Sequence, residues 1–453
     1  MNERPRVLLI EPPGLFLDGA GLTRQVLPLG LASVGAAVAG RAHVRLLLPD
    51  TRARHAGDPW ALILAAIADE APDVIGMTAV TANFPSAARL AGLIKGRWPR
   101  LPIVLGGVHA STEPKAALVA AAAVDWLIAG EGELAFGELL AALMAGQGVV
   151  AQPELIGGLH WRDAEGQHRA ASPRPPIADL DALPPPLRDG LVWPQDIQPA
   201  FHQAMITLRG CPYRCIYCAV PGLDANRTRF RSASAVVDEI ADLRARFGID
   251  YLFFHDSVFT LNRRRTLALC DEMVRRGQQI RFCCQTRADR VDPALLSAMV
   301  AAGLHQVFFG IESGDPDTLR RIRKDMPLSR IRAAVAEVKA LGLRCSGFFM
   351  IGFPWEDADT MTRTADFACD LGLDAVSLFS ATPLPGTELW QLAEASKMPE
   401  SVDFRRPQVN LTAMNDAAYT ELYDRIEARV VTYNQAAMMG PGGGGARLNW
   451  IAP

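Results

Sequence analysis

The sequence predicts an α/β protein with two parallel sheets, one doubly wound and one rolled into a partial barrel. Short apolar runs alternate with amphipathic stretches over about residues 5–145, and the alternation resumes after about residue 202. A proline-rich stretch separates the two series. Strands that alternate with helices form parallel sheets, because each crossover helix returns the chain to the same edge of the sheet.

The first domain is expected over residues 1–148. Its apolar runs predict strands at 6–10, 43–48, 73–78, 103–105 and 125–128, with helices near 29–39, 59–69, 85–97, 114–121 and 133–144. This order predicts a doubly wound, flavodoxin- or Rossmann-like sheet that is covered by helices on both faces. Ligands of such sheets bind at the carboxyl ends of the strands, so the loops there are the candidate site.

The remaining chain is expected to contain a linker, a barrel and a small helical end. Prolines crowd residues 172–187, which predicts a linker over 149–200, with a small hairpin near 159–166. Within 201–398, strands are expected at 204–208, 251–255, 280–284, 306–311, 345–351 and 375–379. Six strand–helix pairs predict a partial (β/α)6, TIM-like barrel. Residues 399–453 are expected to form a helical region, with a helix at 416–433 and a flexible glycine-rich tail.

Composition bounds the classes of function. Of the 453 residues, 49% are hydrophobic and 21% charged, which is typical of a globular protein with a sizeable core. A net charge of -3 and the lack of a Lys/Arg block argue against nucleic acid as a partner. The apolar runs are too short for a signal peptide or a membrane span. We therefore expect a cytoplasmic protein whose cysteines are reduced.

Three cysteines on one loop are the most specific motif. Cys211, Cys215 and Cys218 are spaced as Cys-x3-Cys-x2-Cys. Three thiolates can hold three corners of a [4Fe-4S] cluster and leave the fourth iron open for a ligand. A structural zinc site needs four ligands, and no second cysteine pair lies nearby. A disulfide would leave an odd thiol. Zinc or inert cysteines remain the alternatives to a cluster.

This cysteine run resembles the cluster loop of the radical S-adenosylmethionine (radical SAM) superfamily. The family has the same spacing and an aromatic residue before the last cysteine, here Tyr217. The resemblance implies that S-adenosylmethionine (SAM) binds the open iron and is cleaved to methionine and a 5′-deoxyadenosyl radical. That radical abstracts hydrogen from an inert carbon, while the protein positions the cofactor and excludes water.

Segments after the later barrel strands also resemble the family and imply SAM contacts. Asp256 would contact the methionyl amino group, and Arg287 would bind the methionine carboxylate or a substrate anion. Glu312 and Ser313 would face the ribose, and Gly352 would lie along the adenine. Each residue has a plainer explanation: a helix cap for Asp256, a surface arginine for Arg287, and strand-end turns for the others.

The first domain resembles the cobalamin-binding domain that precedes many radical SAM domains. The resemblance rests on the ordered segments 76–83, 106–111 and 130–133. Paired glycines at a strand end let a large flat ligand lie on the backbone. The implied cobalamin contacts are Thr78, Thr81, Asn83, Gly106, Gly107, His109, Glu131 and Gly132. A response-regulator-like or nucleotide-binding flavodoxin-type domain is the alternative.

One departure concerns the ligand below cobalt. Many cobalamin proteins carry Asp-x-His-x-x-Gly, whose His ligates cobalt, but here Arg52 follows Asp50 at the His position. His55 and His109 remain as histidines of this domain. We therefore hypothesise that the tail base is off cobalt and that no His lies beneath it, which a cobalt–nitrogen signal in the paramagnetic spectrum would contradict.

Together these resemblances imply a cobalamin-dependent radical SAM enzyme. The expected reaction is methylation of an unactivated carbon through the 5′-deoxyadenosyl radical and methylcobalamin. A cyclase, a ring-contracting or an oxidative enzyme without methyl transfer, and a cobalamin or redox sensor, are the alternatives. An electron donor of flavodoxin or ferredoxin type is implied. The barrel-mouth residues His255, Arg287 and Phe353 are mixed apolar and cationic, so a small-molecule, lipid or peptide substrate fits equally.

Overall fold

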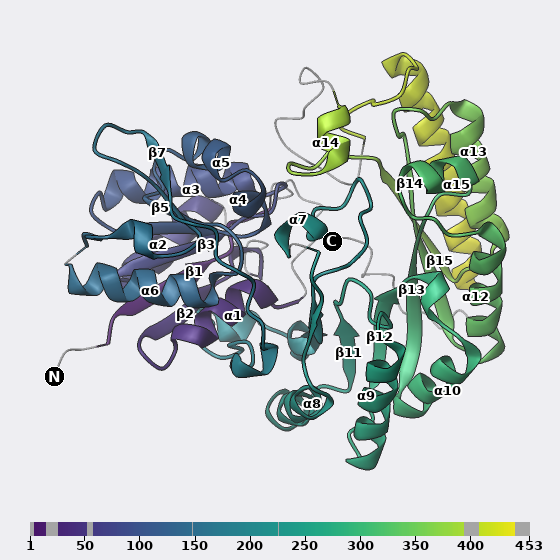
Figure 1. The fold of residues 1–453 in the computed structure, drawn as a ribbon, viewed down its shortest axis with the longest axis horizontal. Coiled ribbons are helices and arrows are strands. Elements are labelled where there is room, and N and C mark those ends of the chain that lie inside the picture. Colours follow the sequence, from purple (N-terminus) through teal and green to yellow (C-terminus); the bar gives the residue numbers. More distant parts are fainter. Residues whose placement is uncertain are drawn as a thin grey trace. The chain divides into compact units, whose positions relative to one another are not determined.

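The computed structural model describes residues 4–14, 26–51, 58–146, 148–224, 226–393 and 407–439. Contacts divide the chain into two compact units (Figure 1). Unit 1 comprises Met1–Gln203 and Gly222–Ala225, and unit 2 comprises Ala204–Pro221 and Asn226–Pro453.

Unit 1 is built on a seven-stranded sheet in the order β2-β1-β3-β4-β5-β6-β7. Its first five strands are mutually parallel. They are β1 (Arg6–Ile10), β2 (His43–Leu47), β3 (Val74–Thr78), β4 (Ile103–Gly106) and β5 (Trp126–Ile128). The strands are almost continuously apolar because both faces of a parallel sheet are covered. The predicted doubly wound sheet is confirmed.

Helices cover both faces of this sheet. The helices α1 (Leu29–Val38) and α6 (Gly132–Ala145) pack against each other. On the opposite face, one apolar core joins the strands to α2 (Pro59–Glu70), α3 (Phe84–Arg97), α4 (Val108–Thr112) and α5 (Pro114–Ala120). The α2 helix starts where its sequence predicts, because Asp58 accepts a hydrogen bond from the Trp60 amide (2.9 Å) and Pro59 occupies the first turn.

The predicted linker over 149–200 contributes to the sheet of unit 1. Within it, β6 (Leu159–Arg162) pairs antiparallel with β5, and β7 (His168–Ala170) pairs antiparallel with β6. Asp163 closes their turn by accepting hydrogen bonds from the amides of Glu165 and Gln167. The predicted hairpin is therefore an extension of the sheet, and contacts group residues up to Gln203 with unit 1. The other predicted domain limits stay predictions.

Unit 2 contains a six-stranded parallel sheet in the order β15-β14-β13-β12-β11-β8. This sequential order is that of a partial barrel, as predicted. The strands are β8 (Ala204–Met205), β11 (Tyr251–Phe254), β12 (Arg281–Thr286), β13 (Leu304–Glu312), β14 (Arg344–Ile351) and β15 (Ala375–Ser380). A short antiparallel ribbon, β9 (Leu208–Arg209) with β10 (Arg229–Phe230), brackets the cysteine loop.

The helices that follow the barrel strands lie on the outer side of the curved sheet (Figure 1). They are α8 (Ala233–Phe247), α9 (Arg263–Arg275), α10 (Pro293–Ala302), α11 (Pro316–Arg321), α12 (Leu328–Ala340) and α13 (Ala358–Asp370). Side chains at the N-caps of α8, α9, α10, α11 and α13 each accept a backbone hydrogen bond from the first turn. These caps explain why the helices begin where the sequence predicts.

The remaining helices are α7 (Val220–Leu223), α14 (Glu388–Leu392) and α15 (Asp416–Met439). Tyr419 and Tyr423 of α15 pack in a small core with Ile351 and Met361. The predicted glycine-rich tail and residues 394–406 lie outside the described residues. Among the described residues, no helix combines the length and the apolar character that a membrane crossing requires.

Candidate cofactor-binding site

The cysteine loop follows β9 at the carboxyl edge of the barrel sheet. Gly210 turns the chain with φ 89°, and the thiols of Cys211, Cys215 and Cys218 are reduced and half-buried. Ile216, between the second and third cysteines, is 3% exposed in the main core, and its amide donates to the Ile322 carbonyl oxygen (3.3 Å). The loop is thus anchored by one apolar side chain and presents its three thiols around that anchor.

The environment of these thiols fits a group that brings positive charge with it. Burial raises the pKa of the Cys218 thiol to about 11 and also raises the pKa of Cys211. Bound iron would supply the charge that keeps such thiols ionised. Among the described residues, no three ligating side chains converge on one point as a single ion requires. Because each thiolate of a cubic cluster binds a different iron, the donor set fits the predicted [4Fe-4S] cluster.

Arg287, at the end of β12, lies beside this loop and keeps a spare donor. Its guanidinium donates to both carboxylate oxygens of Asp289 (2.8 and 3.0 Å) and to the Lys324 carbonyl oxygen (2.8 Å). It also lies 4.0 Å from the ring centre of Tyr213 in the cysteine loop. Only 4% of Arg287 is exposed, and its Nη1 is buried without a hydrogen-bond partner. An anionic ligand would satisfy that nitrogen, as the predicted carboxylate contact requires.

Glu312 ends β13 in a strained conformation with φ 75°. Its carboxylate accepts a hydrogen bond from Lys324 Nζ (3.0 Å), and both side chains are about nine-tenths buried. The Tyr217 hydroxyl bonds to the same carboxylate, and burial, with the Glu312 charge, raises the pKa of Tyr217 well above its usual value. At Gly310, a Cβ atom would stand 2.7 Å from Glu312 Oε1. Backbone strain held by surrounding contacts is a feature of ligand sites.

Asp256, a predicted SAM contact, is held by hydrogen bonds within the protein. It is 1% exposed and accepts hydrogen bonds from the Thr207 amide (2.7 Å), the Thr207 hydroxyl (2.5 Å) and the Leu208 amide (2.9 Å). Burial raises the pKa of its carboxyl group, and these hydrogen bonds oppose the rise. This placement favours a positioning role, in which Asp256 fixes the strand that leads into the cysteine loop.

Ser313 and Gly352 also have structural explanations. Ser313 is fully buried, and its hydroxyl bonds to Thr364 (3.0 Å) and accepts from the Asp315 amide (3.1 Å). Gly352 has φ 93°, and a Cβ atom there would lie 2.3 Å from the Tyr419 hydroxyl oxygen. A glycine is therefore required by packing at this strand end, whatever ligand also approaches it.

Glu356 is a residue that the sequence reasoning missed. Its carboxylate accepts hydrogen bonds from the amides of Gly352 (2.7 Å) and Phe353 (3.0 Å). It is 3% exposed, and burial raises its pKa to about 7. The sequence did carry a signal for Glu356, namely an acidic residue four positions after the glycine that follows a strand. Lys324 and Asp289 were missed too. They bond to Glu312 and Arg287 across turns whose geometry cannot be read from the sequence.

In unit 1, the backbone segments that follow β3 and β4 pack closely at the carboxyl edge of the sheet. Gly106 ends β4, and Gly107 follows with φ 95°. A Cβ atom at Gly107 would lie 2.6 Å from both the Ala79 carbonyl oxygen and Thr78 Oγ1. Only glycine fits there, because its missing side chain lets the backbone after β4 pack directly against the turn after β3, and we call this packed edge the glycine cradle.

Side chains around this cradle are held by local contacts. His109 stacks on Phe84 at 4.0 Å between ring centres, and its Nδ1 lies 3.3 Å from Thr81 Oγ1. Burial lowers the pKa of His109 to about 4, so its imidazole is neutral at pH 7. Val80 and Val108 are 46% and 38% exposed. This neutral, partly apolar edge fits a cobalamin, while Arg52 and His55 lie outside the described residues.

The other predicted cobalamin contacts surround the same edge. Asn83 Oδ1 accepts from the Val80 amide (2.9 Å), which closes the turn before α3. Glu131 accepts from the Ile177 amide (2.6 Å), and Gly132 opens α6 close to Val34. The ligand roles of these residues and of the barrel residues stay predictions.

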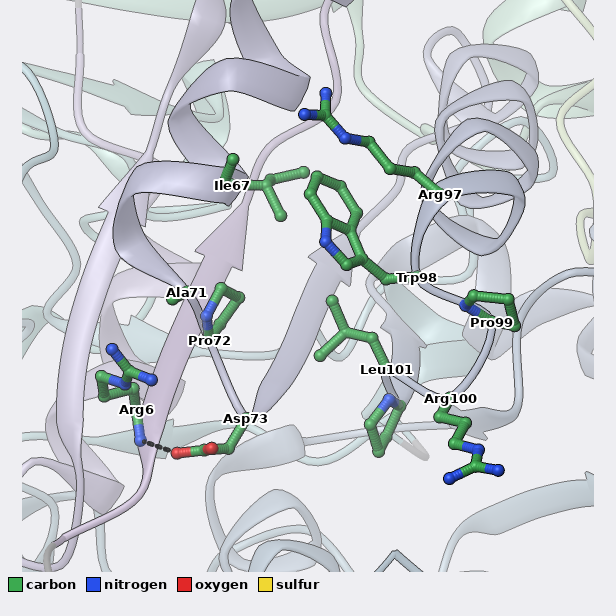
Figure 2. Close-up of a pocket in the computed structure, with 12 residues that line it drawn as sticks. Arg6, Ile67, Ala71, Pro72, Asp73, Arg97, Trp98, Pro99, Arg100 and Leu101 are labelled. Carbon is green, nitrogen blue, oxygen red and sulfur yellow. Dashed lines mark hydrogen bonds between the residues drawn. The ribbon is translucent and has the colours of Figure 1, made fainter.

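A cavity of about 640 Å³ lies at the opposite edge of the unit 1 sheet (Figure 2). Its walls come from the segments that precede β1, β3 and β4, including Asp73 and Pro102, and from the loop around Trp98. The Arg6 amide donates to Asp73 across it (2.7 Å). None of the predicted cobalamin contacts lines this cavity, so the cavity is separate from the candidate site.

Family models match both halves of the chain. The model of the radical SAM superfamily matches residues 205–368, and the model of the B12 binding domain matches residues 19–140. An uncharacterized methyltransferase of Pyrococcus horikoshii is 33% identical over 340 residues, which cover 74% of this chain and 72% of that protein.

Two further relatives have named activities. An anaerobic magnesium-protoporphyrin IX monomethyl ester cyclase of Rubrivivax gelatinosus is 27% identical, with 78% of this chain and 64% of that protein covered. A cytidylyl-2-hydroxyethylphosphonate methyltransferase of Streptomyces wedmorensis is 28% identical, with 70% and 66% covered. The chain spans slightly less than two thirds of these two proteins.

Solved structures share the fold. The radical SAM methyltransferase TsrM from Kitasatospora setae, with cobalamin and a [4Fe-4S] cluster bound, has a TM-score of 0.70 at 20% identity and covers 88% of this chain and 80% of its own. The cobalamin-dependent radical SAM enzyme OxsB has a TM-score of 0.67 at 19% identity, covering 96% and 56%.

The matches confirm the predicted fold class, with a B12-binding domain ahead of a radical SAM domain. They also confirm the prediction of an enzyme of this class and its cofactor set of cluster, SAM and cobalamin. The three-thiol loop and the glycine cradle are the features of this chain that fit those cofactors. The chain belongs to the radical SAM superfamily, in the group whose members carry an N-terminal B12-binding domain.

Proposed function

We propose that the protein is a cobalamin-dependent radical SAM methyltransferase that adds a methyl group to an unactivated carbon. The observation that carries this proposal is the buried, unpaired Nη1 of Arg287 beside a reduced three-cysteine loop. The loop supplies the thiol donors for a cluster, and Arg287 supplies a nitrogen that could bind an anion. The 33% identity to a protein named methyltransferase supports methyl transfer over other radical reactions.

The residues of unit 2 would bind and orient the cofactors. Bound together, the cluster, SAM and cobalamin supply the electron, the hydrogen-abstracting radical and the methyl carrier. Cys211, Cys215 and Cys218 would hold the cluster. Arg287 Nη1 would donate to the SAM carboxylate, and Glu312 would accept from ribose hydroxyl groups. Lys324 and Tyr217 hold the Glu312 carboxylate in place (3.0 Å from Lys324).

The residues of unit 1 would bind cobalamin through shape rather than charge. Gly107 keeps a side chain out of the close contact with Ala79, and Thr78 and Thr81 would offer hydroxyl groups for the corrin amides. The His109 imidazole stays neutral because burial lowers its pKa to about 4. A neutral edge adds no cation next to the cofactor. The absence of a His at position 52 supports a cobalt without a His ligand below it.

A cyclase is the second candidate, and the Rubrivivax gelatinosus relative named a cyclase favours it. Such an enzyme would use the same cofactor-binding residues without transferring a methyl group. For either reaction, we propose a small electron donor of flavodoxin or ferredoxin type. A cytoplasmic location is proposed as well, since all eight cysteines are free thiols.

The products formed from SAM distinguish the two reactions. The protein is reconstituted anaerobically with iron, sulfide and cobalamin, and the products are counted under reductant with candidate substrates. Equal amounts of S-adenosylhomocysteine and 5′-deoxyadenosine are expected for methyl transfer. 5′-Deoxyadenosine without S-adenosylhomocysteine would favour the cyclase. Neither product, from protein that carries the cluster, would contradict both.

A further inference from the structure

The barrel sheet of unit 2 has two faces with different cores. Side chains such as Phe254, Phe282 and Phe309 point outward into the main core beneath the helices. Alternate side chains point to the inner face, where Phe253, Cys283 and Phe308 form a separate cluster with Tyr251 and Phe348. The inner face is therefore lined by its own set of aromatic rings.

Three of these rings, Phe253, Phe308 and Phe348, form a row across the inner face that Phe379 of β15 continues. Ring centres are 5.6 Å apart for Phe253–Phe308, 5.7 Å for Phe308–Phe348 and 6.2 Å for Phe348–Phe379, and the first two pairs are stacked. We name this row the aromatic diagonal. The strand register pairs Phe348 with Gly310 and Phe379 with Met350, so each ring stands nearer the carboxyl edge than the one before.

The exposure of the rings increases along the diagonal. Phe253 and Phe308 are 7% and 6% exposed, whereas Phe348 and Phe379 are half-buried. The exposed end lies close in sequence to the ligand-facing positions, because Glu312 follows Gly310 by two residues and Gly352 follows Met350 by two. Phe348 thus lies on β14, which leads to the predicted SAM contact Gly352, and Phe379 lies on the neighbouring strand β15.

The structure also changes the expected character of the barrel mouth. Phe353 is fully buried and stacks on Trp355 at 5.4 Å, so it belongs to the core. Arg287 is bound to Asp289, and its spare nitrogen is the one proposed for SAM. Glu312 is paired with Lys324. Of the cationic side chains expected at the mouth, Arg287 is engaged and His255 packs its ring against Phe253 (4.1 Å between ring centres), whereas Phe348 and Phe379 are half-buried.

Building on the function proposed above, we propose that the substrate is a flat, uncharged, ring-containing molecule that stacks on Phe348 and packs against Phe379, whose ring is tilted by 50° to that of Phe348. Aromatic rings bind flat partners by offset stacking and gain free energy beyond area burial alone. A charged group placed against these rings would lose its water without gaining an ion-pair partner. The two rings would therefore favour a substrate that is flat and carries no charge.

Three matched probes test this proposal on the anaerobically reconstituted holoenzyme. Methyl 2-naphthoate is flat and neutral, 2-naphthoate is flat and anionic, and methyl decahydronaphthalene-2-carboxylate is neutral but not flat. Binding is measured by equilibrium dialysis with SAM present. We expect the flat ester to bind at least fivefold more tightly than either other probe, from the usual strength of stacked aromatic pairs.

Variants locate the binding surface. The double variant Phe348→Leu/Phe379→Leu should weaken binding of the flat ester about fivefold and leave SAM binding unchanged. Phe247→Leu is the matched control, because Phe247 is a half-buried aromatic at the end of α8, on the outer side of the barrel. Melting curves confirm that each variant is folded.

Several results would overturn the proposal. These are no binding of the flat ester, equal or tighter binding of the anionic or saturated probe, or an unchanged affinity in the double variant. Weakened SAM binding in the double variant would assign the rings to SAM instead. Product formation from SAM is measured separately, so failure of this inference is distinguishable from failure of the proposed methyl transfer.

Discussion

The two candidate edges of this protein are built in opposite ways. At the barrel edge, the functional atoms belong to side chains that hold one another, as Arg287 does with Asp289 and Glu312 with Lys324. At the unit 1 edge, the surface is made by backbone and by a glycine, Gly107, where any side chain would collide with Ala79.

The difference follows from what each edge would bind. A cluster and a small charged ligand need a few point contacts, and these must be preorganised because each is a buried polar or ionised group. A corrin is broad and needs an area from which side chains are absent. Loss of a side chain should therefore damage the barrel edge, and addition of one should damage the unit 1 edge.

The largest expected effect is at the cysteine loop. Replacing Cys211, Cys215 or Cys218 by serine removes a thiolate ligand, so bound iron and the formation of 5′-deoxyadenosine should fall below about a tenth of the values for the unmodified protein. Iron analysis and product counting measure this. Cys369→Ser, a half-buried thiol on α13, is the control and should retain the cluster. If all three variants retained the cluster, these side chains would not build the barrel edge, and the contrast between the two edges would fail.

The second effect tests the unit 1 edge by addition. Gly107→Ala places a Cβ atom 2.6 Å from backbone at φ 95°. We expect a loss of about 3 kcal/mol in stability, from backbone strain and collision together, and a more than tenfold weaker affinity for cobalamin. Gly166→Ala is the control, because Gly166 has φ 75° but open space around it, so it shows the strain alone. Stability is measured by thermal melting and cobalamin affinity by dialysis. Equal losses of both in the two variants would show that the close approach of Gly107 to Ala79 is unimportant.

The third effect tests whether Asp256 positions the barrel edge. Asp256→Ala leaves the buried amides of Thr207 and Leu208 without an acceptor, which should cost about 3 kcal/mol. Asp256→Asn keeps one acceptor oxygen and should cost about 1 kcal/mol. Denaturant unfolding measures both. If instead both variants unfold normally while SAM binding is lost, Asp256 is the ligand contact that the sequence suggested.

The smallest effect is a pH dependence at Glu356. Its folded pKa is about 7, and the usual value of 4.5 applies when the chain is unfolded. Because the folded pKa is raised, the stability that Glu356 contributes is fully present below pH 4.5 and is lost as pH rises through 7. Between pH 5.5 and 8 the loss should be about 2 kcal/mol. Glu356→Gln stays neutral, so the same loss should be missing from its melting curves, and an unchanged pH profile would refute this assignment.

Much of the fold follows from local pattern. The strand β1 (Arg6–Ile10) and the helices α2 and α13, each with its capping aspartate, begin within a residue or two of their predicted positions. Apolar runs fix strands because each buried strand needs two covered faces. The cysteine spacing likewise placed the cluster loop after the first barrel strand.

The pairing of charged side chains could not be predicted in the same way. Lys324 meets Glu312 only because the turn after α11 brings the lysine back beneath β13. The hydrogen bonds that Asp256 accepts from Thr207 and Leu208 were equally absent from the sequence pattern. Such pairs depend on side-chain positions set by long-range packing, which local propensity does not encode.

The sequence by itself determined the family, the order of the two folds and the positions of the thiol donors, because spacing and periodicity are local properties. Only the tertiary structure decided which charges are free. It left Arg287 Nη1 without a partner, buried Phe353 in the core and aligned Phe348 with Phe379 on the inner face. Those outcomes depend on strand register and on neighbours distant in the chain, which arise when the sheet closes.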